Sequence, residues 1–176
     1  AIGVVIENAI GGLGNDTINA GDGDDFISQT AVSDGRDFVD GGAGIDTYTL
    51  HGVGGGAETF RIYTRDAWDA VAGNDINALN ANTEIVITRD GTGVGSIIAE
   101  LDNIEEIRVN SLNTTADNGN SEILPDGGAA GLGDNVIVIG DFTSTSLDYN
   151  TIRVQGTSEN DTIDITGLTS AHRVVF

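Results

Sequence analysis

Cysteine and methionine are absent from this chain of 176 residues, and proline occurs once, at Pro125. Without cysteine the fold has no disulfide to stabilise it and no thiolate nucleophile. Aromatic residues make up 5% of the chain, which argues against a surface of clustered aromatic rings of the kind that stacks on sugars. No apolar run approaches the length of a membrane span, so we predict no insertion into a membrane. Any stabilising staple must therefore be something other than a covalent bond, and bound metal is one option.

Basic residues are also scarce, with 7 Lys and Arg against 28 Asp and Glu, and the net charge is −21. Nucleic acids and anionic membranes would be repelled by such a chain, so neither is expected as a partner. The self-repulsion should keep the chain expanded until something neutralises it. The charge balance therefore points to cations as ligands.

The familiar catalytic motifs are missing. The sequence contains no HExxH, no GxSxG and no P-loop, and only two histidines, His51 and His172. Glu105 and Glu106 are adjacent on a predicted strand, so their side chains point to opposite faces and cannot share one cleft. The segment DGDD at residues 22–25 lacks the alternating ligands and terminal Glu of an EF-hand. We predict that this chain is not an enzyme.

What the chain does contain is a nine-residue unit, written four times between residues 11 and 49. Three residues, 29–31, interrupt the register between the second and third copies. The copies are GGLGNDTIN (11–19), AGDGDDFIS (20–28), VSDGRDFVD (32–40) and GGAGIDTYT (41–49).

Every copy has Gly at its fourth position, Asp at its sixth and an apolar residue at its eighth, which predicts a glycine-rich turn followed by a very short strand. One such unit cannot bury a hydrophobic face alone, so the units must stack. The predicted fold is all-β, a right-handed parallel β-roll with its eighth positions inside, continuing into a β-solenoid or β-helix. Those inward positions are Ile18, Ile27, Val39 and Tyr48.

The sixth-position aspartates, Asp16, Asp25, Asp37 and Asp46, should line up along the turns when the units stack. Carboxylate and carbonyl oxygens are the ligands of hard cations, and calcium tolerates irregular geometry that magnesium does not. The pattern therefore predicts Ca2+ as the cofactor. The alternative is that these residues only form Asx-type turns, in which Asp accepts a hydrogen bond from a nearby backbone N–H and no metal is needed.

The four units, with the preceding segment IENAIGG at residues 6–12, resemble the repeats-in-toxin, or hemolysin-type, modules of secreted bacterial proteins such as serralysin-type proteases. The resemblance covers about forty residues. It implies a calcium-binding, non-catalytic module that is exported by type I secretion machinery and folds on extracellular calcium. A secreted, extracellular location follows from the same resemblance.

The resemblance also implies that each ion lies between one unit and the next but one, held by main-chain carbonyls and the sixth-position Asp of both. Val32 and Ser33 replace two of the usual glycines, and the first loop of the third set lacks glycines as well. The implied ligands are Gly12, Gly14, Asp16, Val32, Asp34 and Asp37 for a first site; Gly21, Gly23, Asp25, Gly41, Ala43 and Asp46 for a second; and Glu7, Ala20, Asp22 and Asp25 for a third. For Glu7, a place in a capping strand is the alternative.

Beyond residue 49 the strict motif ends, and we divide the chain into a β-roll at 1–49 and a degenerate parallel solenoid at 50–176. Trp68 lies in the only stretch with helical character, 67–80, which we predict to be a loop or single helical turn that covers apolar surface; stacking on a sugar is the alternative. Residues 113–133 are rich in Asn, Asp, Ser and Gly and predict an exposed excursion. Strands are predicted at 59–63, 84–89, 96–101, 104–109, 136–139, 151–154, 162–165 and 173–176.

Near the end of the chain, Asn150, Asp161 and His172 recur every eleven residues, each two before an apolar residue. This spacing predicts that the strands at 151–154, 162–165 and 173–176 stack directly on one another, with at most one weak ion at Asp161. The chain begins without Met or a charged leader, so we expect it to be continuous with a longer parent protein. The alternative function is a C-terminal module of a secreted protease, polysaccharide epimerase or adhesin that contributes to substrate or surface binding.

Overall fold

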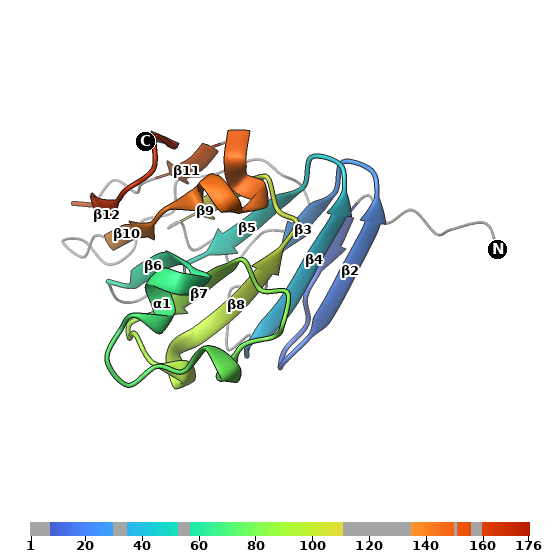
Figure 1. The fold of residues 1–176 in the computed structure, drawn as a ribbon. Helices are drawn as coiled ribbons and strands as arrows, with labels where there is room; N and C mark the ends of the chain where they lie inside the picture. The colour runs from blue at the N-terminus through green and yellow to red at the C-terminus, as the bar shows by residue number, and fades with distance from the viewer. Residues whose placement is uncertain (1–7, 30–34, 53–56, 111–134, 150, 156–159) are drawn as a thin grey trace.

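The computed structural model describes residues 8–29, 35–52, 57–110, 135–149, 151–155 and 160–176. Across these residues the structure is built mainly of strands, which form two sheets with only short helices around them (Figure 1). The all-β class is therefore confirmed. The excursion predicted at 113–133 and the residues Val4 to Glu7 lie outside the described part of the chain.

Within the described residues one sheet has six strands, and every neighbouring pair in it is parallel. In spatial order its strands are β1 (Asn8–Ile10), β3 (Phe26–Ser28), β5 (Thr47–His51), β9 (Glu106–Asn110), β11 (Thr151–Gln155) and β13 (Arg173–Val175). The order in space is the order in the sequence.

The second sheet has seven strands in the described residues and is mixed. In spatial order they are β12 (Thr162–Leu168), β10 (Asn135–Gly140), β6 (Thr59–Thr64), β7 (Ile85–Arg89), β8 (Ile97–Asp102), β4 (Asp37–Ala43) and β2 (Thr17–Asp22). The pairs β6–β7 and β7–β8 are antiparallel and the others are parallel. An uninterrupted parallel solenoid after residue 49 is therefore wrong, since the chain turns back twice here.

Successive strands alternate between the two sheets, apart from β6, β7 and β8, which all belong to the seven-stranded sheet. The nine-residue period explains this alternation, because two units make one circuit of the chain. Asn8 of β1 pairs with Phe26 of β3, 18 residues on, whereas Thr17 of β2 pairs with Phe38 of β4, 21 residues on. The extra three residues correspond to the insertion at 29–31.

The same alternation corrects the prediction for the end of the chain. Strand β11 pairs with β13, and Thr151 lies opposite Arg173, 22 residues on. The intervening strand β12 belongs to the other sheet, where it pairs with β10. Direct stacking at a spacing of eleven is therefore wrong, and two eleven-residue units make one circuit, just as two nine-residue units do.

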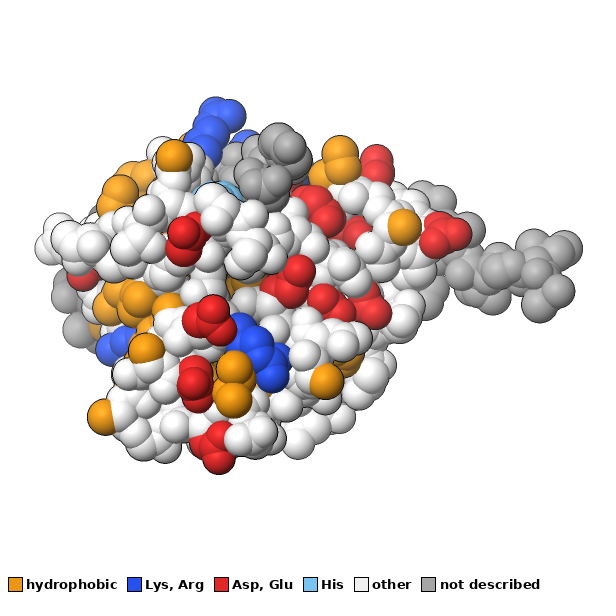
Figure 2. Space-filling view, in the orientation of Figure 1, with side chains coloured by type: hydrophobic (Ala, Val, Ile, Leu, Met, Phe, Trp, Pro, Cys, Tyr) orange, Lys and Arg blue, Asp and Glu red, His pale blue; other side chains and the backbone are white. Residues whose placement is uncertain are grey.

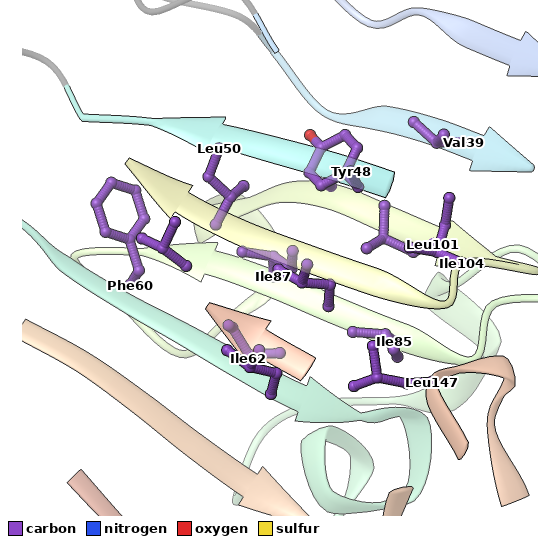
Figure 3. Packing of buried hydrophobic residues seen from close by; sticks show 14 of the residues in the cluster. Val39, Tyr48, Leu50, Phe60, Ile62, Ile85, Ile87, Leu101, Ile104 and Leu147 are labelled. Atoms are coloured by element: carbon purple, nitrogen blue, oxygen red, sulfur yellow. The ribbon is translucent and has the colours of Figure 1, made fainter. Parts of the chain in front are cut away.

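The main hydrophobic core lies between the sheets (Figure 3). Three of the four predicted inward positions, Ile27, Val39 and Tyr48, are no more than 1% exposed, and the fourth, Ile18, is half-buried against the same core. Strands after the repeats continue this core. Their fully buried side chains include Phe60, Ile62, Ile85, Ile87, Leu101, Ile107 and Ile152.

A smaller core covers the outer face of the seven-stranded sheet. Its centre is Trp68, fully buried on the short helix α1 (Arg65–Asp69), whose N-cap Thr64 accepts a hydrogen bond from the Ala67 backbone. A single helical turn over apolar surface is what the sequence predicted for Trp68. The remaining short helices are η1 (Ile76–Ala78), η2 (Val94–Ser96), η3 (Phe142–Ser144) and η4 (Ser146–Tyr149).

Candidate metal centre

The turns that join the sheets carry the acidic residues of the repeats. Three neighbouring turns that lead from the seven-stranded to the six-stranded sheet are 22–25 after β2, 43–46 after β4 and 102–105 after β8. Because β2, β4 and β8 are neighbours, these turns stack. We call them the acidic turns. Acidic side chains gather over the ends of β4 and β8 on the face shown in Figure 2.

The residues of the second predicted site are all described, and the structure brings its two loops together. The backbone N–H of Asp25 donates to Asp46 Oδ1 at 2.8 Å, and the Gly23 N–H donates to the Ala43 carbonyl at 2.8 Å. Gly21 and Gly42 lie in register on β2 and β4. The pairing of one unit with the next but one is the one that the resemblance implied.

Glycine is required where these loops meet. Gly42 has φ of 100° and Gly44 has φ of 152°, a region that other residues rarely adopt. A Cβ added at Gly42 would overlap the carbonyl oxygen of Gly21, and one added at Gly44 would overlap that of Gly23. The glycines at the second and fourth positions of this unit, Gly42 and Gly44, thus let the two stacked turns approach within main-chain contact.

The first predicted site is described in part. The backbone N–H of Asp16 donates to Asp37 Oδ1 at 2.9 Å, and the Gly12 N–H donates to Asp16 Oδ2 at 2.7 Å. The Gly14 carbonyl lies against Gly35. Val32 and Asp34 lie outside the described residues. The structure therefore places the Asp16 backbone against the Asp37 carboxylate. The positions where Val32 and Ser33 replace glycine lie outside the described residues.

The third predicted set is divided. Glu7 lies outside the described residues, and Ala20 is 2% exposed with its side chain in the main core. Asp22 is exposed at the end of β2, whereas Asp25 is buried in the turn. These two aspartates are therefore near in sequence but differ in surroundings.

Asp46 is the most enclosed carboxylate of the repeats, with no exposed surface. Its Oδ1 accepts the Asp25 hydrogen bond, but its buried Oδ2 has no hydrogen-bond donor among the described residues. Burial raises the pKa of Asp46; the Asp25 N–H lowers it, and the carboxylates of Asp25, Asp24 and Asp40 raise it further. A buried, incompletely solvated carboxylate is costly, and a cation would offset that cost.

Three further carboxyls, on β4 and in the turn after β8, also have a raised pKa. Burial is the largest cause of the raised pKa of Asp37, Asp102 and Glu105, and a neighbouring carboxylate raises each further: Asp16 for Asp37, Asp40 for Asp102, and Asp46 for Glu105. A raised pKa means that folding disfavours the charged form. The folded chain therefore holds the negative charges of Asp37, Asp102 and Glu105 at a cost in folding free energy.

This arrangement predicts an unusual pH dependence. A carboxyl whose folded-state pKa is raised binds its proton more tightly in the folded chain, so metal-free stability should increase as the pH falls from 7 through the raised values. Shifts of opposite sign, at the exposed Asp75, Asp141 and Asp164, act only as the pH falls below their ordinary value of 3.8. Melting in EDTA, followed by circular dichroism, should show a higher midpoint near pH 5 than at pH 7. A flat or falling midpoint over that interval would contradict the prediction.

Sequence reasoning missed the residues of the third acidic turn. Glu105 accepts a hydrogen bond from the Asp46 backbone N–H at 2.7 Å, and Asn103 Nδ2 donates to Asp40 Oδ1 at 2.9 Å. Neither residue belongs to a nine-residue unit. The signal that would have found Glu105 is its place immediately before a strand, where the repeats carry their sixth-position Asp.

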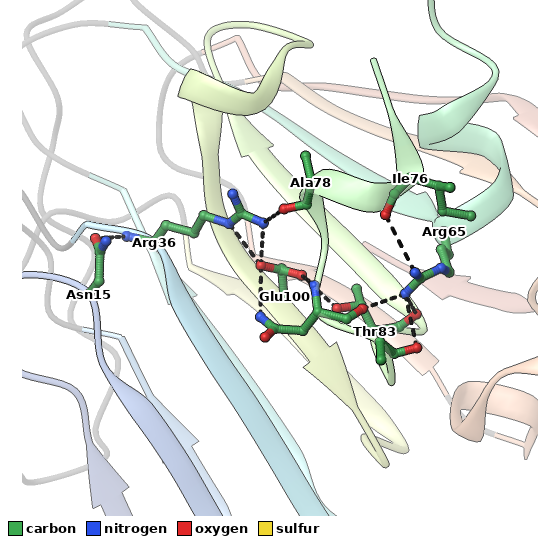
Figure 4. A network of polar contacts seen from close by, with 9 residues as sticks. Asn15, Arg36, Arg65, Ile76, Ala78, Thr83 and Glu100 are labelled. Carbon is green, nitrogen blue, oxygen red and sulfur yellow. Dashed lines mark hydrogen bonds and ion pairs between the residues drawn. The ribbon is translucent and has the colours of Figure 1, made fainter.

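A different polar cluster lies on the outer face of the seven-stranded sheet, beside the repeats (Figure 4). Glu100 is 1% exposed and accepts hydrogen bonds from Arg36 Nε at 2.7 Å, from the Asn80 backbone at 2.7 Å and from Thr83 Oγ1 at 2.6 Å. The Arg36 guanidinium also donates to the Ala78 carbonyl. The cluster joins the third repeat unit to the segment that covers the outer face, and its charges are used internally.

The described residues contain no group of three or more His, Cys, Asp and Glu side chains placed to hold a metal ion. A cation here would therefore need carbonyl oxygens beside one or two carboxylates.

No helix in the described part of the chain is long and apolar enough to cross a membrane. No family model matches the sequence, and neither the curated proteins nor the solved structures gave a significant match.

Proposed function

We propose that this chain is a non-catalytic calcium-binding module of an exported bacterial protein, with its nine-residue units wound as a right-handed parallel β-roll. The observation that carries the proposal is the pair Asp25 and Asp46. The two aspartates lie in stacked glycine-rich turns, both are at most 1% exposed, and Asp46 Oδ2 has no donor among the described residues. A hard cation is the ligand that such oxygens favour.

The donor set fits calcium by its chemistry. It consists of carboxylate oxygens and the main-chain carbonyls of Gly21, Gly23, Gly41 and Ala43, with no sulfur or imidazole nitrogen. Glycine keeps these loops in main-chain contact, since a side chain at Gly42 would overlap the Gly21 carbonyl. When bound, the ion supplies positive charge to buried carboxylates that repel one another.

Ligand-coupled folding is the mechanism we propose. With a net charge of −21 the metal-free chain repels itself, and burial raises the pKa of the Asp37 and Asp46 carboxyls, which disfavours their charged form. A site of the extracellular class binds with a Kd of about 0.1 to 1 mM, and tenfold excess calcium then adds about 1.4 kcal/mol per site. The chain would stay loose in calcium-poor cytosol and fold outside, as type I export requires.

Calorimetry on paired variants tests the assignment to the repeats. Asp25→Asn removes a carboxylate that the second and third sites share, and should weaken calcium binding about tenfold or more, because a neutral amide attracts the ion far less. The matched control is Asp161→Asn, which makes the same change just before β12, away from the stacked turns. Equal losses in both variants would show that the C-terminal segment is a calcium site as well, and would contradict an assignment to the repeats alone.

The second candidate, a substrate- or surface-binding module of a protease, epimerase or adhesin, gains less from the structure. A surface hollow lies beside Asn15, Arg36 and Arg89. Both of its arginines are engaged, Arg36 with Glu100 at 2.6 Å and Arg89 with Glu58 at 3.1 Å. Both guanidinium charges are thus already paired within the chain, so we retain calcium binding as the proposed function.

A further inference from the structure

The acidic ladder of the repeats continues into a turn that has no repeat sequence. Asp37 to Asp40 of β4 pair in parallel with Ala99 to Asp102 of β8, and Thr47 of β5 pairs with Glu106 of β9. The turn at 102–105 is thereby held against the turn at 43–46 from both sides. It follows that Glu105 lies beside Asp46, although 59 residues separate them in the chain.

The hydrogen bonds repeat from one turn to the next. Asp25 donates its backbone N–H to Asp46 Oδ1 at 2.8 Å, and Asp46 donates its own to Glu105 Oε2 at 2.7 Å. Behind them, the Thr47 N–H donates to the Asp25 carbonyl, and the Glu106 N–H donates to the Asp46 carbonyl, both at 2.9 Å. Glu105 thus stands to Asp46 as Asp46 stands to Asp25.

An oxygen without a donor lies at this junction. Asp46 Oδ2 is fully buried and has no hydrogen-bond partner among the described residues. It is 2.6 Å from the position that a Cβ on Gly41 would take, and the Asn103 carbonyl oxygen borders that same position even more closely. A carboxylate oxygen and a carbonyl oxygen therefore converge beside Gly41, and Asn103 adopts a left-handed backbone there, with φ of 51°.

The surroundings are acidic. Beside the burial that raises the pKa of each carboxyl, Asp40 raises the pKa of Asp46 and of Asp102, and Asp46 raises the pKa of Glu105. Asn103 Nδ2 donates to Asp40 Oδ1, and no described donor reaches Asp46 Oδ2. Converging oxygens with no donor suit a hard cation.

We propose that a divalent cation of the calcium class binds between the second and third acidic turns, held by the carboxylates of Asp46 and Glu105 and the main-chain carbonyl of Asn103. The site lies partly outside the nine-residue units, because Asn103 and Glu105 belong to the third acidic turn. It would extend the ladder by one ion beyond what the repeats alone provide, and so tie the strands β8 and β9 to the repeat segment.

Equilibrium dialysis against calcium, with bound metal counted by mass spectrometry, tests the site in the full chain. Glu105→Gln keeps an oxygen that accepts the Asp46 N–H, and should lose one calcium per chain or weaken it tenfold or more. The matched control, Glu106→Gln, alters the next residue, whose carboxylate faces Arg108 at 3.1 Å, and should keep the wild-type count. An unchanged count in Glu105→Gln would overturn this site while leaving the repeat sites intact.

A second readout separates a metal ligand from a structural residue. In EDTA, Glu105→Gln removes a carboxylate that repels Asp46, so its melting midpoint should rise, and the midpoint gained on adding calcium should shrink. A purely structural role would lower the midpoint in both conditions and overturn the proposal. If the wild-type protein binds no calcium at all, the proposed function fails together with this site. If Asp25→Asn loses calcium and Glu105→Gln does not, only the site in the third acidic turn is contradicted.

Discussion

Adding millimolar calcium to protein prepared in EDTA is expected to convert a loosened chain into the folded one. The physical reason is mass action on a chain that carries −21 charge and several buried carboxyls. At about ten times the Kd each site adds about 1.4 kcal/mol. Two sites would then raise the melting midpoint by roughly 6 to 11 °C, using about 2 to 4 °C per kcal/mol for a chain of this size.

Two probes follow this transition. Circular dichroism should gain β signal, and the emission of Trp68, the only tryptophan, should shift to the blue as its side chain is buried under the outer face of the sheet. Magnesium at equal concentration is the control, and should have much less effect because it demands a regular octahedral shell and dehydrates reluctantly. An identical spectrum and midpoint in EDTA and in calcium would refute coupled folding.

Replacing Glu100 by alanine is expected to destabilise the folded chain by about 3 to 5 kcal/mol, the range found when one partner of a buried ion pair is removed. The reason is that the buried Glu100 accepts from Arg36, Asn80 and Thr83, and its loss leaves those donors without their acceptor. Urea unfolding in saturating calcium, monitored by Trp68 emission, measures the difference.

Glu106→Ala is the matched control for that experiment. Glu106 makes ion pairs with Arg108 at 3.1 Å and Arg153 at 3.9 Å, and both arginines are at least a third exposed. Pairs of this kind contribute about 0 to 1 kcal/mol. An equal loss of unfolding free energy in the two alanine variants would contradict this prediction. It would show that the buried cluster around Glu100 stabilises the folded chain no more than a surface ion pair does.

The polar cluster around Glu100 and the first predicted metal site both use residues of the third repeat unit. Arg36 contacts Glu100, and its own backbone N–H donates to Asn15 Oδ1 at 2.9 Å in the first unit. The next residue, Asp37, accepts the Asp16 N–H. Calcium at Asp16 and Asp37 would therefore order the turn that also positions the Arg36 guanidinium. The repeats and the segment that covers the outer face of the seven-stranded sheet should then gain stability together.

Periodicity made much of this fold predictable. A motif that repeats every nine residues places equivalent residues at equivalent positions, so the burial of Ile27, Val39 and Tyr48 follows from spacing. The pairing of Asp25 with Asp46 is what the resemblance to repeats-in-toxin modules implied. The strands beyond the repeats were also located correctly from their apolar patterns, to within two residues at each end for β7, β8 and β9.

Spacing did not reveal which strand lies next to which once the repeats end. The pattern for residues 59–63 predicts a strand that continues the coil, but β8 takes the place beside β4, and β6 lies two strands further away. Local sequence determines that a segment is extended, whereas its neighbours depend on which apolar faces close the core with least exposed edge. The outcome at residues 151–176 differed for the same reason.

By itself, then, the sequence determined the strands and the matched positions of the aspartates, because both depend on residue types at fixed spacing; the two-unit circuit within the repeats was implied by the family resemblance. Only the tertiary structure decided that the antiparallel pairs β6–β7 and β7–β8 bring β8 back to β4. That return places Glu105 against Asp46 and Glu100 against Arg36. Contacts between segments 59 and 64 residues apart arise from how the sheets close around their shared core, which no local pattern records.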